Sequence, residues 1–335
     1  MIKSILTPQQ LKVKLTSYNF EFSNDEFEEL MSLGYFHVFN SLVDKNDRNN
    51  AVAKKLSDYL VLYKSDLKLR NIMFSMIIRL ENYFKQRLND TIVEELLNKS
   101  ILSPHYNDVV QHCIKPSRNV EIKKLLFGSA RIDHQIVSHY FDNHNDIPIW
   151  AYLELMNLGS FIQLLTNCTD INDIPNNVNK VKENYLVKCN FIRNNGTNFT
   201  SNTKASYIIN GLNLIKDIRN NIAHNQPIID ARYTNKKTKY KDNNIKKSII
   251  DLSQKINPSH SQILESDFNI KKITTSIALV YIFYIHTFGK DEYSDELLNF
   301  SREVIKQNIK NINNVLHSKI FGSDYIKIVD FLISL

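Results

Sequence analysis

The longest regular feature of the sequence is a run of helical periodicity from Lys54 to Asn98. Only seven glycines and seven prolines occur in the 335 residues, and these are the residue types that most often break helices. Few breakers and a helical period of this length favour a helical protein. The apolar residues of the run recur mostly at steps of three or four: Leu56, Leu60, Tyr63, Leu67, Ile72, Met76, Leu80, Phe84 and Leu88.

Start and stop signals indicate helices elsewhere in the chain. Thr7 followed by Pro8, and Ser23 followed by Glu26, have the residue types of helix N-termini, and Gly34 is a predicted helix end. The sequence therefore predicts a helical lead-in over residues 1–50, a helical core over 51–230, and a basic loop with C-terminal helices over 231–335. Within the last part, helices are expected at 273–288, around 295–316 and at 325–335.

The stretch after Pro148 predicts a second buried part of the core. Pro148 starts a helix that leads into Leu153–Phe161, which is apolar nearly all round. Trp150 is therefore interpreted as a core residue and not as a ligand platform. Glu154 is expected among apolar neighbours, where its carboxylate needs an arginine or a backbone group as partner.

Charged residues along the run from Lys54 to Asn98 are interpreted first as a solvated helix face. Pairs such as Glu81 with Lys85 stabilise a helix by only about a few tenths of a kcal/mol. The same stretch contains Asp66 and Arg70.

Composition and cysteine content indicate the class of protein. Hydrophobic residues at 43% and charged residues at 23% are ordinary for a globular chain. Three cysteines without metal-ligand spacing favour a reducing cytoplasm, with no disulfide framework and no zinc site. No cofactor is expected. The N-terminus lacks the apolar run of a signal peptide, and the most apolar stretch, Ile277–Ile285, is about half the ~20 residues that span a membrane. His134, His139 and His144 lie five apart, so they do not share a helix face and are interpreted as surface residues.

A basic segment accounts for nearly all of the formal charge. Between Arg232 and Lys247, seven basic residues oppose Asp242 alone, a charge of +6 out of the total of +7. Interleaved tyrosines and lysines suit a single-stranded nucleic acid, because bases stack on rings while ammonium groups meet phosphates. The alternative is a solvated loop. The candidate nucleic-acid-binding residues are Arg232, Tyr233, Lys236, Lys237, Lys239, Tyr240, Lys241, Lys246 and Lys247.

The candidate catalytic residues lie in the stretch Asp217–Ile228. Arg219 is permanently cationic, and His224 can carry or release a proton near neutral pH. Such a pair suits chemistry at a phosphodiester, with a cation for the developing negative charge and an acid or base for the proton. Taken alone, the spacing favours a structural interpretation, with an arginine that caps or pairs with Glu154 and a histidine at a helix end.

Four pieces of the sequence, in order, resemble the Abi family of bacterial abortive-infection proteins, of the AbiD/AbiF type, which contain a HEPN fold. The resemblance extends over roughly residues 5–230. The pieces are Leu6–Leu11 with Leu33–Phe36, Tyr63–Arg70 with Glu81, Pro148–Gly159, and Ile218–His224.

The resemblance implies an all-α protein built as a HEPN-type helical bundle. It also implies RNA cleavage without a metal ion, at a site assembled across a homodimer. Arg219, Asn220 and His224 match the HEPN active-site pattern. Similar proteins are toxins held in check by a small noncoding RNA, and a catalytically silent RNA-binding protein is the alternative. Asp66, Arg70, Glu81 and Glu154 then become supporting residues around the site.

The motif spacing adds a geometric expectation. Positions five apart on a regular helix differ by about 140° in direction, so Arg219 and His224 do not share a face. Both can serve one phosphate if the helix ends before His224, or if a second copy of the chain supplies one of them.

Overall fold

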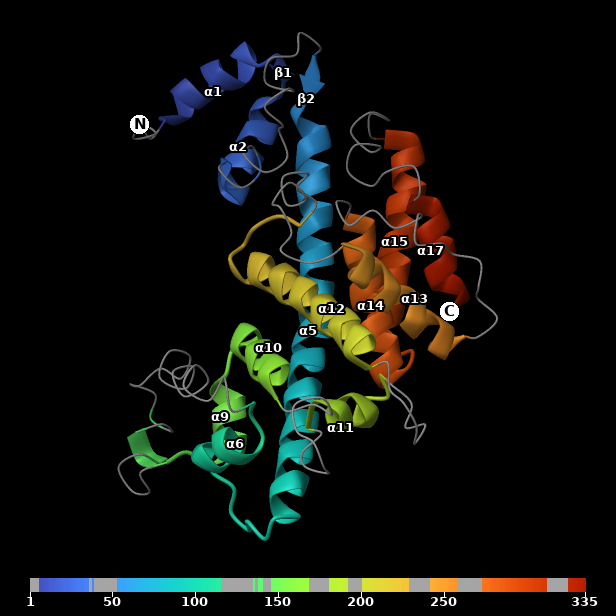
Figure 1. The fold of residues 1–335 in the computed structure, drawn as a ribbon. Coiled ribbons are helices and arrows are strands. Elements are labelled where there is room, and N and C mark those ends of the chain that lie inside the picture. Colours follow the sequence, from blue (N-terminus) through green and yellow to red (C-terminus); the bar gives the residue numbers. More distant parts are fainter. Residues whose placement is uncertain are drawn as a thin grey trace. The chain divides into compact units, whose positions relative to one another are not determined.

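The computed structural model describes residues 6–35, 38, 53–115, 135, 138–140, 146–168, 181–191, 201–228, 242–257, 273–311 and 325–335. These residues are almost entirely α-helical (Figure 1), which confirms the predicted all-α class. The strands β1 (Phe20–Glu21) and β2 (Lys54–Lys55) form a short parallel pair, with Phe20 opposite Lys54.

The helices α1 (Pro8–Ser17) and α2 (Asn24–Leu33) begin at the predicted caps. The Thr7 hydroxyl accepts a hydrogen bond from the backbone N–H of Gln10, and the Gln10 side chain accepts one from the N–H of Thr7. Ser23 and Glu26 form the same reciprocal capping box at α2. Gly34 follows α2 with φ of 87°, a conformation that favours glycine.

The helix α5 (Leu56–Leu97) corresponds to the predicted periodic run and is 42 residues long. All the apolar residues of the predicted stripe are buried except Leu67, which is half-buried. The helix ends with Ser100 in the left-handed region, at φ of 62°.

The described residues fall into two compact units. The first contains those from residues 1–76, 217–239 and 256–335, and the second those from 77–216 and 240–255. The helices α5 and α12 (Ser201–Ala223) contribute to both units. The three consecutive segments expected from the sequence stay a prediction.

The C-terminal helices of the first unit pack on one another, and they are α14 (Ile273–Phe288), α15 (Glu292–Asn311) and α17 (Tyr325–Ser334). The residues 277–285 of α14 are all buried, as predicted for a core helix. α15 begins three residues before its expected start because Asp291 caps it. The Asp291 carboxylate accepts hydrogen bonds from the backbone N–H groups of Tyr293 and Ser294.

The second unit contains the rest of α5 and several short helices. The apolar stretch after Pro148 forms two helices, because Met156 is extended and the Asn157 side chain caps the next helix at Ser160. A Cβ atom on Gly159 would lie 3.1 Å from Asn157 Oδ1, so glycine fits closely there. The short helices are α6 (Tyr106–His112), α9 (Ile149–Leu155), α10 (Leu158–Asn167), α11 (Val181–Lys188) and α13 (Asp242–Ile256).

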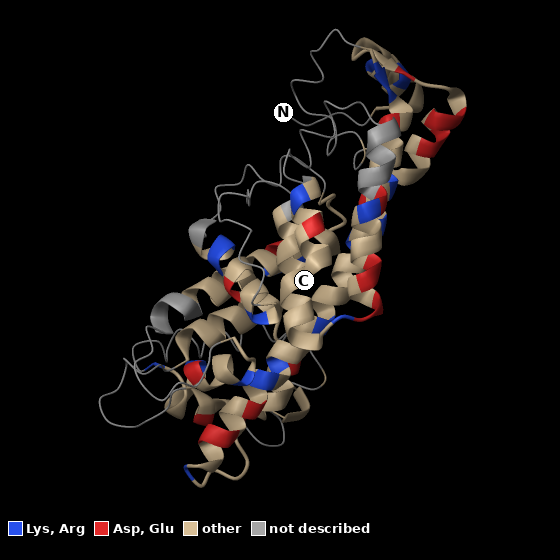
Figure 2. Cartoon of the chain, turned by 90° about the vertical axis from the view of Figure 1, so that its right-hand side faces the viewer, with Lys and Arg blue, Asp and Glu red and all other residues tan. Residues whose placement is uncertain are grey.

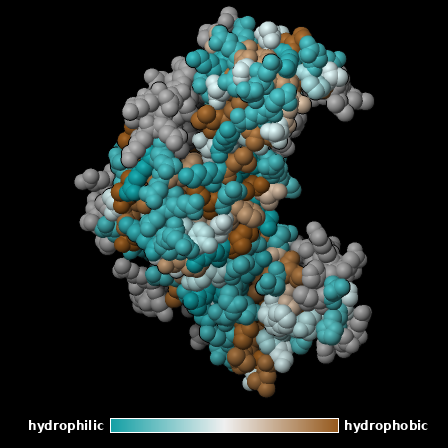
Figure 3. Space-filling model, turned by 180° about the vertical axis from the view of Figure 1, so that it is seen from behind, coloured by the Kyte–Doolittle hydropathy of each residue, from teal (hydrophilic) through white to brown (hydrophobic). Residues whose placement is uncertain are grey.

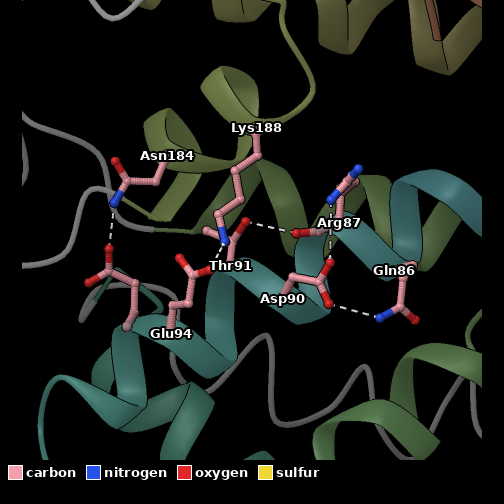
Figure 4. A network of polar contacts seen from close by, with 8 residues as sticks. Gln86, Arg87, Asp90, Thr91, Glu94, Asn184 and Lys188 are labelled. Atoms are coloured by element: carbon pink, nitrogen blue, oxygen red, sulfur yellow. Dashed lines mark hydrogen bonds and ion pairs between the residues drawn. The ribbon is translucent and has the colours of Figure 1, made fainter.

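Polar contacts join α11 to α5 within the second unit (Figure 4). Lys188 Nζ lies 2.6 Å from Glu94 Oε1. Asn184 donates a hydrogen bond of 2.5 Å to Glu95 Oε1. A lysine and an amide from one helix therefore meet consecutive carboxylates of the other.

The three cysteines, Cys113, Cys168 and Cys189, are free and buried. Burial raises the pKa of Cys168 and of Cys189 to about 12 each, and it also raises the pKa of Cys113. Since the thiolate is the reactive form, we expect the native protein to react very slowly with a thiol reagent at mildly alkaline pH, and all three thiols to react after unfolding. Rapid reaction of one thiol in the native protein would contradict this prediction.

Candidate active site at the end of helix α12

The helix α12 stays regular through His224. The backbone N–H of His224 donates to the carbonyl of Asn220 at 3.0 Å, the ordinary helical bond. The next two N–H groups, of Asn225 and Gln226, donate back to Ile222 and Asn221 at 2.9 and 2.8 Å. With Asn225 at φ of 53°, this is a Schellman ending, in which asparagine occupies the position most often filled by glycine.

The predicted catalytic residues lie around this helix end. Arg219 is half-buried and donates from Nη1 to Asn220 Oδ1 at 3.4 Å, while Asn220 and His224 are exposed. The helix does not end before His224, so the expected divergence of about 140° between Arg219 and His224 holds within one chain. The sequence left two geometries open, a helix that ends before His224 or a second copy of the chain that supplies one residue. The first of these is absent from the described site.

A buried ion pair on α5 contacts the turn that follows His224. Asp66 Oδ2 lies 2.7 Å from Arg70 Nε, and the two side chains are 0% and 4% exposed. Asp66 Oδ1 accepts a hydrogen bond of 2.9 Å from the backbone N–H of Ile228. Arg70 Nη1 donates one of 2.6 Å to Asn225 Oδ1. The pair therefore binds both ends of the segment 225–228.

The solvated face predicted for these charges is wrong for this pair. Asp66 and Arg70 share the covered side of α5 with Leu62, Leu69 and Met73, all of them buried. A carboxylate and a guanidinium stay charged in such a place only when they are paired and hydrogen-bonded. The Arg70 guanidinium also lies over the Tyr63 ring, 5.6 Å from its centroid.

The other two predicted supporting residues have different surroundings. Glu81 pairs with Lys85 at 3.0 Å, and the two side chains are 6% and 12% exposed, so this pair is also buried and not solvated. Glu154 lies exposed on α9, and Trp150 on the same helix is 54% exposed. The predictions of a core tryptophan and of a glutamate among apolar neighbours are therefore wrong. The buried face of α9 consists of Ile149, Ala151, Tyr152 and Leu153.

Of the basic segment, only its end belongs to the described residues. Lys246 and Lys247 lie on α13 and are half-buried. Lys247 Nζ lies over the Tyr207 ring, 5.4 Å from its centroid. Figure 2 shows basic and acidic residues intermixed along the helices. The predicted residues outside the described ranges are Arg232, Tyr233, Lys236, Lys237, Lys239, Tyr240 and Lys241, together with His134 and His144.

Two other features are absent from the part of the chain that the structure describes. No group of three or more histidine, cysteine, aspartate or glutamate side chains there is placed to hold a metal ion. None of the described helices has both the length and the apolar character needed to cross a membrane.

Sequence reasoning missed Asn225 and the N–H of Ile228 as parts of the site. The only local signal is an asparagine ahead of Gln226-Pro227, where a helix must end. Its bond to Arg70 joins residues 155 positions apart, and no periodicity within either segment indicates that contact.

Fold and site together define an all-α protein with an Arg-Asn-x3-His motif on the last turn of a helix. The chain belongs to the Abi-like protein family, whose model matches residues 29–230, more than half of its length. The resemblance to abortive-infection proteins is thereby confirmed at the level of the family. No curated protein and no solved structure matches the chain.

Proposed function

We propose that this protein is a HEPN endoribonuclease of the AbiD/AbiF type that cleaves RNA without a metal ion. The observation that carries the proposal is the helix end described above. Asn220 and His224 are exposed there, Arg219 is half-buried beside them, and a buried ion pair anchors the turn that follows. Membership of the Abi-like protein family supports a role as a toxin in defence against phage.

In the proposed reaction the RNA supplies its own nucleophile. The 2′-oxygen attacks the adjacent phosphorus, its proton passes to a base, and the bond to the 5′-oxygen breaks as that oxygen takes up a proton. The products are a 2′,3′-cyclic phosphate and a 5′-hydroxyl. His224 accepts or delivers one of these protons, Arg219 stabilises the charge on the non-bridging oxygens, and Asn220 orients the imidazole or the phosphate.

The divergence of Arg219 and His224 supports a site shared by two copies of the chain. A homodimer that places two α12 ends side by side supplies the cation and the acid or base together. We further propose that a cognate noncoding RNA holds this toxin in check.

Cleavage of total RNA in excess EDTA tests the proposal. We expect the wild-type protein to cut RNA, and His224→Ala to cut it about 10²–10⁴-fold more slowly, the range for loss of a general acid or base. His112→Ala, which changes a histidine of α6 in the second unit, is the matched control and keeps full activity.

The end groups of the products check the reaction type. Attack by the 2′-oxygen leaves 5′-hydroxyl ends that a kinase phosphorylates without prior phosphatase treatment, and 2′,3′-cyclic phosphates on the other ends. Equal cleavage by wild type and His224→Ala would refute the proposed role of the histidine. RNA binding without cleavage by either protein would instead favour a catalytically silent HEPN RNA-binding protein.

A further inference from the structure

The only tryptophan of the chain lies on the surface, one helical turn from a carboxylate. Scattered exposed apolar side chains are normal, and Figure 3 shows several hydrophobic residues at the surface among hydrophilic ones. Trp150 differs from these because the exposed Glu154 lies four positions further along α9. Residues four apart lie on one face of a helix, with Cβ atoms about 5–6 Å apart.

The backbone that carries Trp150 is held firmly. The N–H of Ile149 donates to the carbonyl of Pro104 at 3.3 Å, and the N–H of Tyr106 donates to the carbonyl of Ile147 at 2.9 Å. The ring of Tyr140 lies 5.9 Å from the indole, with an angle of 87° between the ring planes. The indole is therefore a fixed surface with a second aromatic ring standing beside it.

The side-chain directions bring the carboxylate toward the indole. Helical side chains lean toward the N-terminus of their helix, so Glu154 leans toward the turn that carries Trp150. A flat ring stacked on the indole would have one edge within reach of the Glu154 carboxylate. An exposed indole with an acceptor at its edge is suited to an aromatic ligand that has donors on that edge.

Guanine is the RNA base whose edge matches a carboxylate. Its N1–H and N2–H donors lie next to each other and point the same way, so both oxygens of one carboxylate can accept from it. Adenine and cytosine each place an acceptor nitrogen beside their amino group, and uracil flanks its single N–H with two carbonyls. Recognition of unpaired bases in RNA commonly joins stacking on an aromatic side chain with hydrogen bonds to this edge.

We propose that Trp150 and Glu154 form a binding site for a guanine base of single-stranded RNA. The inference rests on the proposal that RNA is the substrate, and it adds a base preference to it. The carboxylate repels phosphate, so this site binds a base edge and not the RNA backbone.

The single tryptophan makes the site directly measurable, because fluorescence from the protein's indole reports on Trp150 alone. Short oligouridines with one central guanosine or one central adenosine are titrated into the full chain carrying His224→Ala, which keeps them intact. We expect the guanosine oligonucleotide to quench the fluorescence and to bind roughly tenfold more tightly than the adenosine one. Glu154→Gln removes this preference, while Trp150→Ala, followed by anisotropy of labelled RNA, weakens binding roughly tenfold.

Several outcomes would overturn the inference. Binding seen by anisotropy without quenching places the RNA elsewhere, and equal quenching by both oligonucleotides removes the guanine preference. Guanosine monophosphate that binds as tightly as the oligonucleotide identifies a free nucleotide as the ligand. Fluorescence that changes only with protein concentration shows that a second copy covers the indole.

The cleavage assay and the fluorescence titration test the two proposals independently. Absence of RNA cleavage by the wild-type chain, with guanosine-specific quenching intact, refutes the ribonuclease and leaves the base site standing. Cleavage that depends on His224, without quenching by any oligonucleotide, refutes the base site alone.

Discussion

Replacing Arg70 with alanine is expected to lower the free energy of unfolding by about 3–5 kcal/mol. The substitution leaves the carboxylate of Asp66, which is 0% exposed, without the guanidinium 2.7 Å away. It also removes the 2.6 Å bond to Asn225, one of the two hydrogen bonds by which Asp66 and Arg70 bind the segment 225–228 to α5. Denaturant unfolding followed by far-UV circular dichroism measures the loss.

Lys68→Ala is the matched control on the same helix. Lys68 pairs with Glu303 at 3.2 Å, but both side chains are about half exposed, at 52% and 55%. Exposed pairs of this kind contribute about 0–1 kcal/mol. Similar losses of unfolding free energy for Arg70→Ala and Lys68→Ala would show that burial does not determine how much the Asp66–Arg70 pair contributes to stability.

Helix positions could be predicted wherever the deciding residues are local. The bounds of α14 agree with the prediction because its apolar residues are continuous, and α1 and α2 begin at the expected caps. The predicted start of α15 was too late because Asp291, which caps the helix, precedes the apolar residues from which the prediction was made.

Helix ends were harder to predict because glycine is scarce in this chain. Asn225, Asn190 and Ser100 follow α12, α11 and α5 in the left-handed conformation, with φ of 53°, 56° and 62°. In each case two backbone bonds close the helix end, as for Gly in a Schellman motif. In a chain this rich in asparagine, residue type alone does not show which asparagines have this role.

For the candidate site, the sequence indicated the motif residues but not the contacts that surround them. The position of Asp66 four residues before Arg70 indicates an ion pair. The predicted apolar stripe, however, does not reveal that α5 is also covered at Leu62, Leu69 and Met73, beside the pair. For α9, apolar neighbours led to a buried Trp150 and Glu154, whereas the backbone contacts of Pro104 and Ile147 orient this two-turn helix with both residues outward. Long-range contacts decide both cases.

A mixture of two inactive variants is expected to recover RNA cleavage. If each centre combines Arg219 of one copy with His224 of another, Arg219→Ala and His224→Ala are inactive alone for different reasons. Half of the dimers formed at random are mixed, and one of the two centres in each is intact, so about one quarter of wild-type activity returns. Each variant alone is expected at or below about 1% of wild type.

The geometry of α12 is the reason to expect recovery. Its last helical bond, from His224 to Asn220 at 3.0 Å, is intact, so Arg219 and His224 of one chain point about 140° apart. Co-expression of differently tagged copies, followed by two-step purification, isolates the mixed species for the assay. Mixed dimers no more active than either variant would mean that both groups act from the same chain, and α12 would then have to unwind before His224 when RNA binds.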